Sequence, residues 1–162
     1  MADAKLEQKL ERLLDRLEIL LPKIEDEVDW SAAAFRWRRK QYLGMSYGVL
    51  EPIHRVALVD PDSIKNADQQ KAALLRNTEQ FVRGLPANNV LLTGARGTGK
   101  SSLIRACLKQ FADQGLRLIE VDKEDLKDLI DIAQRIAHRP DNFIVFCDDL
   151  SLEFGECGYK AM

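Results

Sequence analysis

The chain has 162 residues, of which 46% are hydrophobic and 31% charged, and its formal net charge is −2. This composition excludes a disordered chain and predicts a globular protein with one core and room for a helical appendage. The nearly balanced charge gives no global reason to expect binding to nucleic acid or to an anionic membrane, and it leaves only local patches as candidates for such contacts.

The cysteines and the N-terminal residues indicate the cellular compartment of the protein. Cys107, Cys147 and Cys157 show no close pair and no metal-ligand spacing, which predicts reduced thiols. No apolar run approaches membrane-spanning length, and the N-terminus is a charged segment without a signal-peptide core. We therefore expect a cytoplasmic protein without membrane contact.

The N-terminal segment has apolar residues at alternating spacings of four and three, with charged residues filling the other face. This spacing predicts an amphipathic helix, which Pro22 should end or kink near Leu21. Such a helix either packs against its own domain or binds a partner protein or a second copy of the chain. The apolar positions are Leu6, Leu10, Leu13, Leu17, Leu20 and Ile24.

A cluster of basic and aromatic residues follows at Ala34–Tyr42. This mixture is typical of two arrangements: contact with the phosphates and bases of a nucleic acid, or burial of the rings with the charged groups in solvent. We favour burial, because the patch is short and isolated, and nucleic acid stays the alternative partner. Gly44, Gly48 and Pro52 then predict an irregular connector over Tyr42–His54.

From residue 60 onward, helical and strand patterns alternate, which predicts a parallel α/β sheet flanked by helices. The predicted strands cover residues 89–93, 116–121 and 143–147. The predicted helices are one over about residues 66–83, one that follows the phosphate loop and is closed by Gly115, and one that Asp122 caps and Pro140 ends. The inward positions expected are Leu74, Thr78, Phe81 and Val82 on the first helix, Leu103, Ile104, Cys107, Leu108 and Phe111 on the second, and Leu126, Leu129, Ile130, Ala133, Ile136 and Ala137 on the third.

The stretch Gly94–Ser101 has the pattern G-x-x-x-x-G-K-S, which predicts a phosphate-binding loop. Gly94 and Gly99 leave the backbone free to wrap around a polyphosphate, so that N–H groups and a helix N-terminus face the anion. We expect Lys100 to bind the β- and γ-phosphates and the Ser101 hydroxyl to be a ligand of Mg²⁺. The expected phosphate-binding residues are Gly94, Ala95, Arg96, Gly97, Thr98, Gly99, Lys100, Ser101 and Ser102.

The last predicted strand ends in Asp148 and Asp149. Parallel strands place their carboxyl ends at one edge of the sheet, where a phosphate loop also lies. The sequence therefore predicts that Asp148 holds Mg²⁺, through water, and that Asp149 is the catalytic residue that orients or polarises the attacking water. Residues Asp122–Asp125 lack the Asn of the guanine-reading pattern N-K-x-D, so adenine is the favoured base and ATP the expected nucleotide.

Three stretches resemble the bacterial AAA-type ATPases of domain-of-unknown-function family 815, in the AAA+ superfamily. They are Asn77–Ser102, Gly115–Val121 and Phe143–Leu150, and the resemblance extends from about Ala34 to the C-terminus. The replication-initiator and helicase-loader branch of AAA+ proteins is also similar, and it tolerates Asp-Asp where many other AAA+ ATPases have Glu as the second acid. The resemblance implies Mg-ATP binding and hydrolysis in oligomers, in which a neighbouring copy supplies an arginine, and an unknown protein partner.

The resemblance also implies that a sensor strand, an arginine finger and a helical lid would follow Met162. We therefore expect the front half of a longer ATPase, with a gapped sheet, exposed strand edges and weak or absent hydrolysis. The expected organisation is an N-terminal helical extension and connector over residues 1–58 and a partial AAA-like ATPase domain over residues 59–162. Two alternatives stay open: a protein-interaction module acting through the N-terminal helix, and a P-loop kinase.

Overall fold

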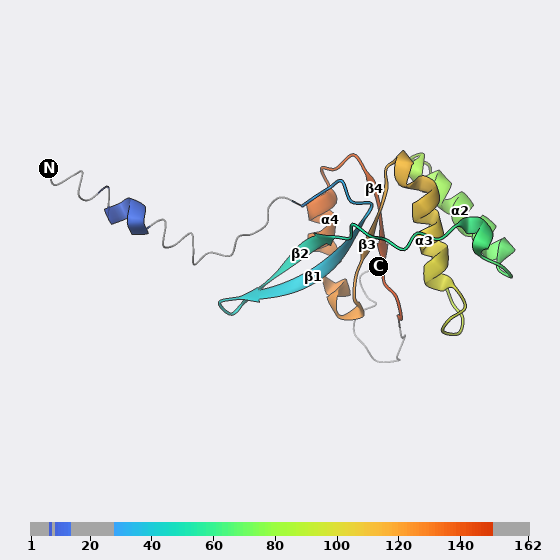
Figure 1. Ribbon diagram of the computed structural model, residues 1–162, viewed down its shortest axis with the longest axis horizontal. Coiled ribbons are helices and arrows are strands. Elements are labelled where there is room, and N and C mark those ends of the chain that lie inside the picture. The colour runs from blue at the N-terminus through green and yellow to red at the C-terminus, as the bar shows by residue number, and fades with distance from the viewer. Residues whose placement is uncertain (1–6, 8, 14–27, 151–162) are drawn as a thin grey trace.

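The computed structural model describes residues 7, 9–13 and 28–150. A four-stranded sheet lies at its centre, in the order β2-β1-β3-β4 (Figure 1). The strands β1 (Ala34–Tyr42) and β2 (Met45–Pro52) form an antiparallel hairpin, and β1 runs parallel to β3 (Leu116–Glu120), which runs parallel to β4 (Asn142–Phe146). The expected α/β class, with a mostly parallel sheet, is confirmed.

Helices cover both faces of this sheet. The helices α2 (Asp68–Val82) and α3 (Lys100–Phe111) lie on one face, and α4 (Leu129–Ile136), preceded by the 3₁₀ helix η3 (Lys123–Asp128), lies on the other (Figure 1). Two shorter 3₁₀ helices are η1 (Pro61–Ser63) and η2 (Ala112–Gln114). The first face is filled mainly by Ala34, Leu74, Leu103, Ile104, Cys107, Leu108, Phe111, Leu116 and Leu118, and the second by Ala32, Phe35, Trp37, Leu50, Ile119, Val121 and Ile132.

The expected helices before and after the glycine-rich loop agree with α2 and α3. All five inward positions predicted for α3 are buried. On α2, Leu74 and Thr78 are buried, while Phe81 and Val82 are partly buried against the same core. The strong amphipathic period of these segments therefore specified their packing faces correctly.

The irregular connector expected over Tyr42–His54 is wrong, because most of it forms strand β2. The pattern in β1 has a period of two: Phe35 and Trp37 are buried on the α4 side, whereas Arg36 and Arg38 form ion pairs with acidic residues that follow β3 or end it. Phe35 and Trp37 are thus buried, as the burial interpretation required, while Tyr42 is only partly buried and the guanidinium groups are partly exposed and also paired with acidic residues. The sheet contains residues from both sides of the domain boundary that was expected between residues 58 and 59.

Gly44 and Gly48, which indicated an irregular connector, have structural roles in the β1–β2 hairpin. Leu43 and Gly44 have φ angles of 47° and 79° and connect the paired residues Tyr42 and Met45, which is the backbone of a tight two-residue hairpin turn. Gly48 lies against the ring of Trp37, so that a Cβ atom at residue 48 would be 1.8 Å from Trp37 Cζ2. Gly48 therefore leaves the space that the buried indole occupies.

We predict that Gly48→Ala lowers the free energy of unfolding by about 1–3 kcal/mol, because the added methyl group must displace a buried ring. Urea unfolding followed by tryptophan fluorescence measures the change. Ser46→Ala, at an exposed position of the same strand, is the control and should stay within about 0.5 kcal/mol of wild type. Equal stability of Gly48→Ala and wild type would contradict the contact with Trp37.

The strand expected over residues 89–93 does not form, so that expectation is wrong. The segment is irregular, and the side chains of Val90 and Leu91 are 48% and 65% exposed. β4 is the edge strand of the described sheet, and within residues 28–150 the segment 89–93 forms no backbone hydrogen bond with it or with any other backbone group. A strand needs a neighbour for its backbone hydrogen bonds, which explains why an apolar run alone does not produce one here.

The inward face expected for the third helix is also partly wrong. Leu126 and Ile136 pack on the core, but Ile130 is 72% exposed and the fully buried residue is Ile132. Ala133 and Ala137 are exposed as well. The cause is η3, whose six residues have 3₁₀ geometry. A 3₁₀ helix advances about 120° per residue instead of about 100°, which rotates the following face by about a third of a turn.

The N-terminal pattern is only partly within the described residues. Residues 9–13 are helical, and Leu10 and Leu13 are 59% and 56% exposed. The remaining leucines of the pattern, Pro22 and Cys157 lie outside the described residues. Where the structure describes the chain, none of its helices combines the length and the hydrophobicity that crossing a bilayer requires.

A buried carboxylate joins the hairpin to the helical layer. The side chain of Asp128, which is 4% exposed, accepts hydrogen bonds from Trp37 Nε1 at 3.0 Å and from Arg39 Nε at 2.8 Å. The guanidinium of Arg135 lies 5.8 Å from the centre of the Trp37 ring. We call Trp37, Arg39 and Asp128 the hairpin latch, because these side chains fix β1 to η3.

We predict that Asp128→Ala destabilises the protein by about 2 kcal/mol, because the buried indole N–H loses its acceptor. Arg39 is 39% exposed and can regain water, so the full effect of breaking a buried ion pair is not expected. Thermal unfolding followed by circular dichroism measures the effect. Asp131→Ala, on the exposed side of α4, is the matched control, and equal melting temperatures for the two variants would contradict the latch.

Candidate functional site

The glycine-rich loop leads into α3 and contains three glycines with positive φ angles. Gly94, Gly97 and Gly99 have φ angles of 141°, 83° and 87°, which residues other than glycine rarely adopt. Gly99 is the N-cap of α3, without a side-chain hydrogen bond to the helix, and the first turn of α3 carries no acidic residue. The first N–H groups of α3 and the positive end of its dipole are therefore available to an anion.

Lys100 crosses back over the loop. Its Nζ donates hydrogen bonds to Gly94 O and to Ala95 O, both at 2.9 Å. Thr98 Oγ1 donates to the same Ala95 carbonyl at 2.8 Å. These bonds hold the turn of the loop together, and Lys100 brings a full positive charge to the lining of the adjoining pocket.

The two sequence motifs meet at a single hydrogen bond. Ser101 Oγ, on the first turn of α3, donates to Asp148 Oδ2, just after β4, at 2.6 Å. The other oxygen of this carboxylate accepts the backbone N–H of Asp149 at 3.0 Å. Asp149 itself has a φ of 52°, a left-handed conformation that Asp tolerates better than most residues. Asp148 is thus held from both sides, while both carboxylates remain exposed.

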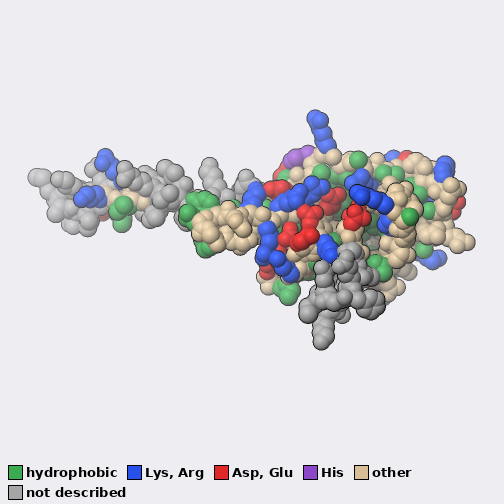
Figure 2. Space-filling model, turned by 90° about the horizontal axis from the view of Figure 1, so that it is seen from below, with side chains coloured by type: hydrophobic (Ala, Val, Ile, Leu, Met, Phe, Trp, Pro, Cys, Tyr) green, Lys and Arg blue, Asp and Glu red, His purple; other side chains and the backbone are tan. Residues whose placement is uncertain are grey.

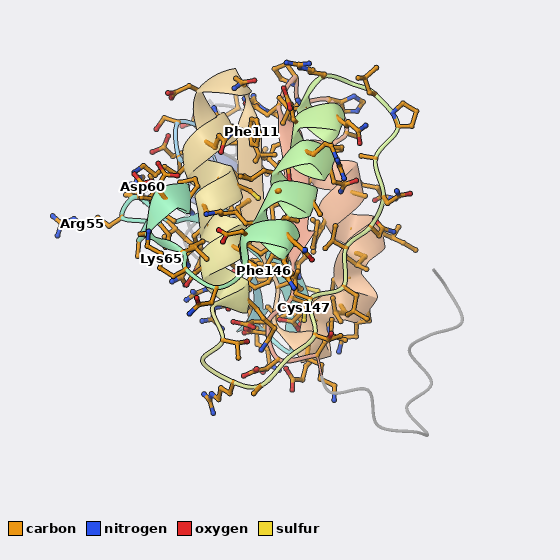
Figure 3. All side chains as sticks on the ribbon, turned by 90° about the vertical axis from the view of Figure 1, so that its right-hand side faces the viewer. Arg55, Asp60, Lys65, Phe111, Phe146 and Cys147 are labelled. Carbon is orange, nitrogen blue, oxygen red and sulfur yellow. The ribbon has the colours of Figure 1, made fainter. Side chains whose placement is uncertain are left out.

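These groups surround one open pocket of about 280 Å³. Figure 3 shows Phe146 and Cys147 at the end of the sheet that lies beside the N-terminal end of α3. Eight of the eleven predicted loop and acidic residues line this pocket, namely Arg96, Gly97, Gly99, Lys100, Ser101, Ser102, Asp148 and Asp149. Gly94, Ala95 and Thr98 are not part of the lining and instead hold the turn behind it.

Charge around the pocket is mixed. Figure 2 shows acidic side chains gathered on the face seen from below, with Lys and Arg beside them. Burial raises the pKa of the Cys147 thiol, and the nearby carboxylates of Asp122, Asp148 and Glu124 raise that pKa further. Cys147 therefore stays a neutral thiol near the pocket, with no tendency to act as a nucleophile.

The residues present fit a nucleotide with Mg²⁺. Among the described residues, no group of three or more His, Cys, Asp or Glu could hold a metal ion by itself. Mg²⁺ commonly binds through one or two protein oxygens together with substrate phosphates and water. Ser101 and Asp148 provide such oxygens next to the loop that carries Lys100, so the donor set suits a metal that arrives with a polyphosphate.

One contact near the site was not anticipated from the sequence. Asn77, on α2, uses both amide atoms to bond the backbone of Asn88, six residues before the loop begins. Nothing in the local pattern indicates this contact, because a polar residue on a helix is ordinarily solvated. The contact arises from the tertiary fold, which places the segment before the loop against α2.

The chain is similar to known proteins over part or most of its length. A stretch of 73 residues, 44% of this chain, is 33% identical to the replication factor C large subunit of Sulfolobus acidocaldarius. The match spans 17% of the length of that relative. No solved structure matches the chain. Residues 30–162 match the model of the family described as "Protein of unknown function (DUF815)", and the chain therefore belongs to this family, which the resemblance of its sequence had indicated.

Proposed function

We propose that this chain is a Mg-ATP-binding module of an AAA-type ATPase. The observation that carries the proposal is the 2.6 Å hydrogen bond between Ser101 and Asp148, which are 47 residues apart. A glycine-rich turn can arise by chance, and so can an acidic residue after a strand. A hydroxyl and a carboxylate in direct contact beside a glycine-rich loop are the oxygen ligands expected for the Mg²⁺ that accompanies a bound polyphosphate.

Phosphate binding would use the loop as it stands. The N–H groups at the start of α3 would donate to phosphate oxygens, and Lys100 Nζ would exchange its bonds with Gly94 O and Ala95 O for bonds with the β- and γ-phosphates. Ser101 and Asp148 would hold Mg²⁺, which supplies charge neutralisation of the polyphosphate when bound. Arg96, in the pocket lining, adds a second positive side chain at the mouth.

We propose Asp149 as the residue that orients the attacking water. Its carboxylate is exposed and lines the same pocket, and its backbone N–H is bonded to Asp148 Oδ1, which fixes the two acids relative to each other. Arg96 and Lys100 are the basic side chains of the described lining, and both belong to the loop itself. We therefore expect slow hydrolysis by a single copy, and faster turnover when another copy supplies an arginine.

We predict that Lys100→Ala raises the Kd for Mg-ATP by about 10- to 100-fold, because charge-assisted hydrogen bonds to the phosphates are lost. Titration of a fluorescent ATP analogue into the purified chain measures the affinity. Lys127→Ala removes an exposed lysine that does not line the pocket, and it should bind like wild type. Equal affinity in wild type and Lys100→Ala would refute the site.

The two acids should separate binding from hydrolysis. We predict that Asp148→Asn loses most of the gain in ATP affinity that Mg²⁺ brings, because the amide keeps an oxygen for Ser101 but lacks the charge.

Asp149→Asn should bind Mg-ATP like wild type and release phosphate at least about 100-fold more slowly. Calorimetry with and without Mg²⁺ and release of radiolabelled phosphate are the measurements. Phosphate transfer to an added acceptor, rather than to water, would favour the kinase alternative.

A further inference from the structure

The backbone that leads into the phosphate loop has few attachments. We call residues 86–93 the approach segment; it contains neither helix nor strand. Across the described part of the chain, no backbone hydrogen bond joins residues 86–94 to another backbone group. Leu92 is partly buried against the core beneath α3, but Val90 and Leu91 are exposed. Burial of one side chain leaves the path of this segment weakly specified.

Asn77 supplies what a neighbouring strand would otherwise provide. Its Oδ1 accepts the Asn88 N–H at 3.0 Å, and its Nδ2 donates to Asn88 O at 2.9 Å. A single planar amide thus satisfies both backbone groups of one residue, and two parallel bonds fix the orientation of the backbone as well as its position. The side chain of Asn88 takes no part in these two bonds.

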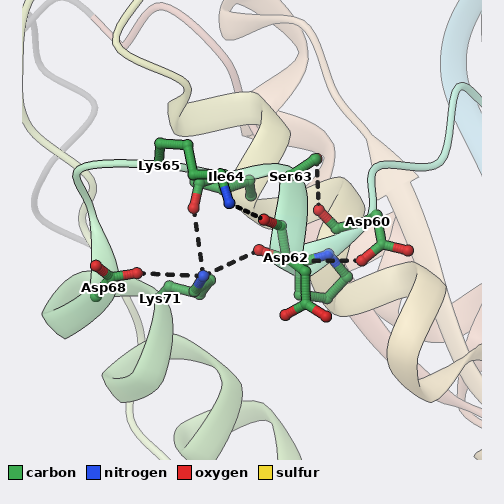
Figure 4. A network of polar contacts seen from close by, with 8 residues as sticks. Asp60, Asp62, Ser63, Ile64, Lys65, Asp68 and Lys71 are labelled. Atoms are coloured by element: carbon green, nitrogen blue, oxygen red, sulfur yellow. Dashed lines mark hydrogen bonds and ion pairs between the residues drawn. The ribbon is translucent and has the colours of Figure 1, made fainter.

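The helix that carries Asn77 is itself held in place. The next residue, Thr78, is buried in the core between α2 and α3. At the start of α2, Lys71 Nζ donates to Pro61 O at 3.0 Å and to Ile64 O at 3.3 Å and pairs with Asp68 (Figure 4). Asp60, which caps η1, pairs with Lys109 of α3 at 2.6 Å. Asn77 is therefore presented by a helix tied to α3, where the phosphate loop ends.

We propose that Asn77 is a positioning residue for the phosphate loop, acting through the backbone of Asn88. This role rests on the nucleotide binding proposed above. The loop is connected at its end to α3, and Asn77 holds its beginning to the neighbouring helix, so the two sides of the loop share one rigid support. Without Asn77, the approach segment must be ordered when the nucleotide binds, and that ordering lowers the affinity.

If Asn77 had a purely structural role, its loss would lower the melting temperature of the unliganded protein and leave the affinity for Mg-ADP unchanged. Alanine has a higher helix propensity than asparagine, so Asn77→Ala should preserve α2 and the unliganded fold. If Asn77 positions the loop, Asn77→Ala raises the Kd for Mg-ADP about tenfold, because the approach segment must then be ordered when the nucleotide binds, while the melting temperature without nucleotide stays unchanged. The matched control is Asn88→Ala, which removes a side chain but keeps the backbone groups that Asn77 binds.

The experiment compares wild type, Asn77→Ala and Asn88→Ala by titration with Mg-ADP, by melting without nucleotide, and by hydrogen exchange of peptides covering residues 86–93. The expected result is weaker binding and faster exchange of this segment in Asn77→Ala alone. Unchanged ADP affinity in Asn77→Ala, or an equal loss in Asn88→Ala, would overturn the role while wild-type binding upholds the nucleotide site. A folded wild-type chain that binds no nucleotide would overturn the proposed function and this role with it.

Discussion

The arrangement of the site depends on the parallel pairing of β3 with β4. Their register pairs Glu120 with Phe146, so both strands end at the same edge of the sheet. The helix α3 packs on the sheet through buried residues such as Ile104 and Leu108, which sets the height of its first turn against that edge. The contact between Ser101 and Asp148 follows from these two packings. Neither residue needs a stabilising role in the core, and each is free to serve a ligand.

The other side of the sheet uses a different device. The β1–β2 hairpin extends the sheet beyond β3, and its buried rings require a partner layer. That layer begins with η3, whose Asp128 is buried because Trp37 and Arg39 satisfy its carboxylate. A polar contact therefore determines how the hairpin meets the helical layer, where an apolar pair would have tolerated several orientations. Gly48 completes the fit by making room for the indole ring.

The sequence predicted those parts of the fold in which local pattern and packing agree. The helices α2 and α3, the strands β3 and β4, and the loop with its two acids could all be located from periodicity and spacing. The period of two in β1 was hidden, because its outward positions carry arginines that suggested a basic patch. The face of α4 could not be predicted, since a 3₁₀ segment such as η3 leaves no mark in composition. The apolar run before Gly94 resembles a strand, but strand formation depends on a neighbour that a local pattern does not reveal. The contact of Asn77 with Asn88 is set by tertiary packing in the same way.

If the loop binds nucleotide as proposed, the two carbonyl groups that accept hydrogen bonds from the Lys100 ammonium would affect its selectivity among anions. Because the ammonium is already satisfied, an incoming anion gains only the difference between its own attraction and that of two peptide dipoles. A singly charged ion gains little from such an exchange. A di- or triphosphate gains much more, because its charge is larger and it reaches the N-terminus of α3 at the same time. In the proposed site, the folded-back lysine would therefore favour ligands of dense negative charge over small singly charged anions.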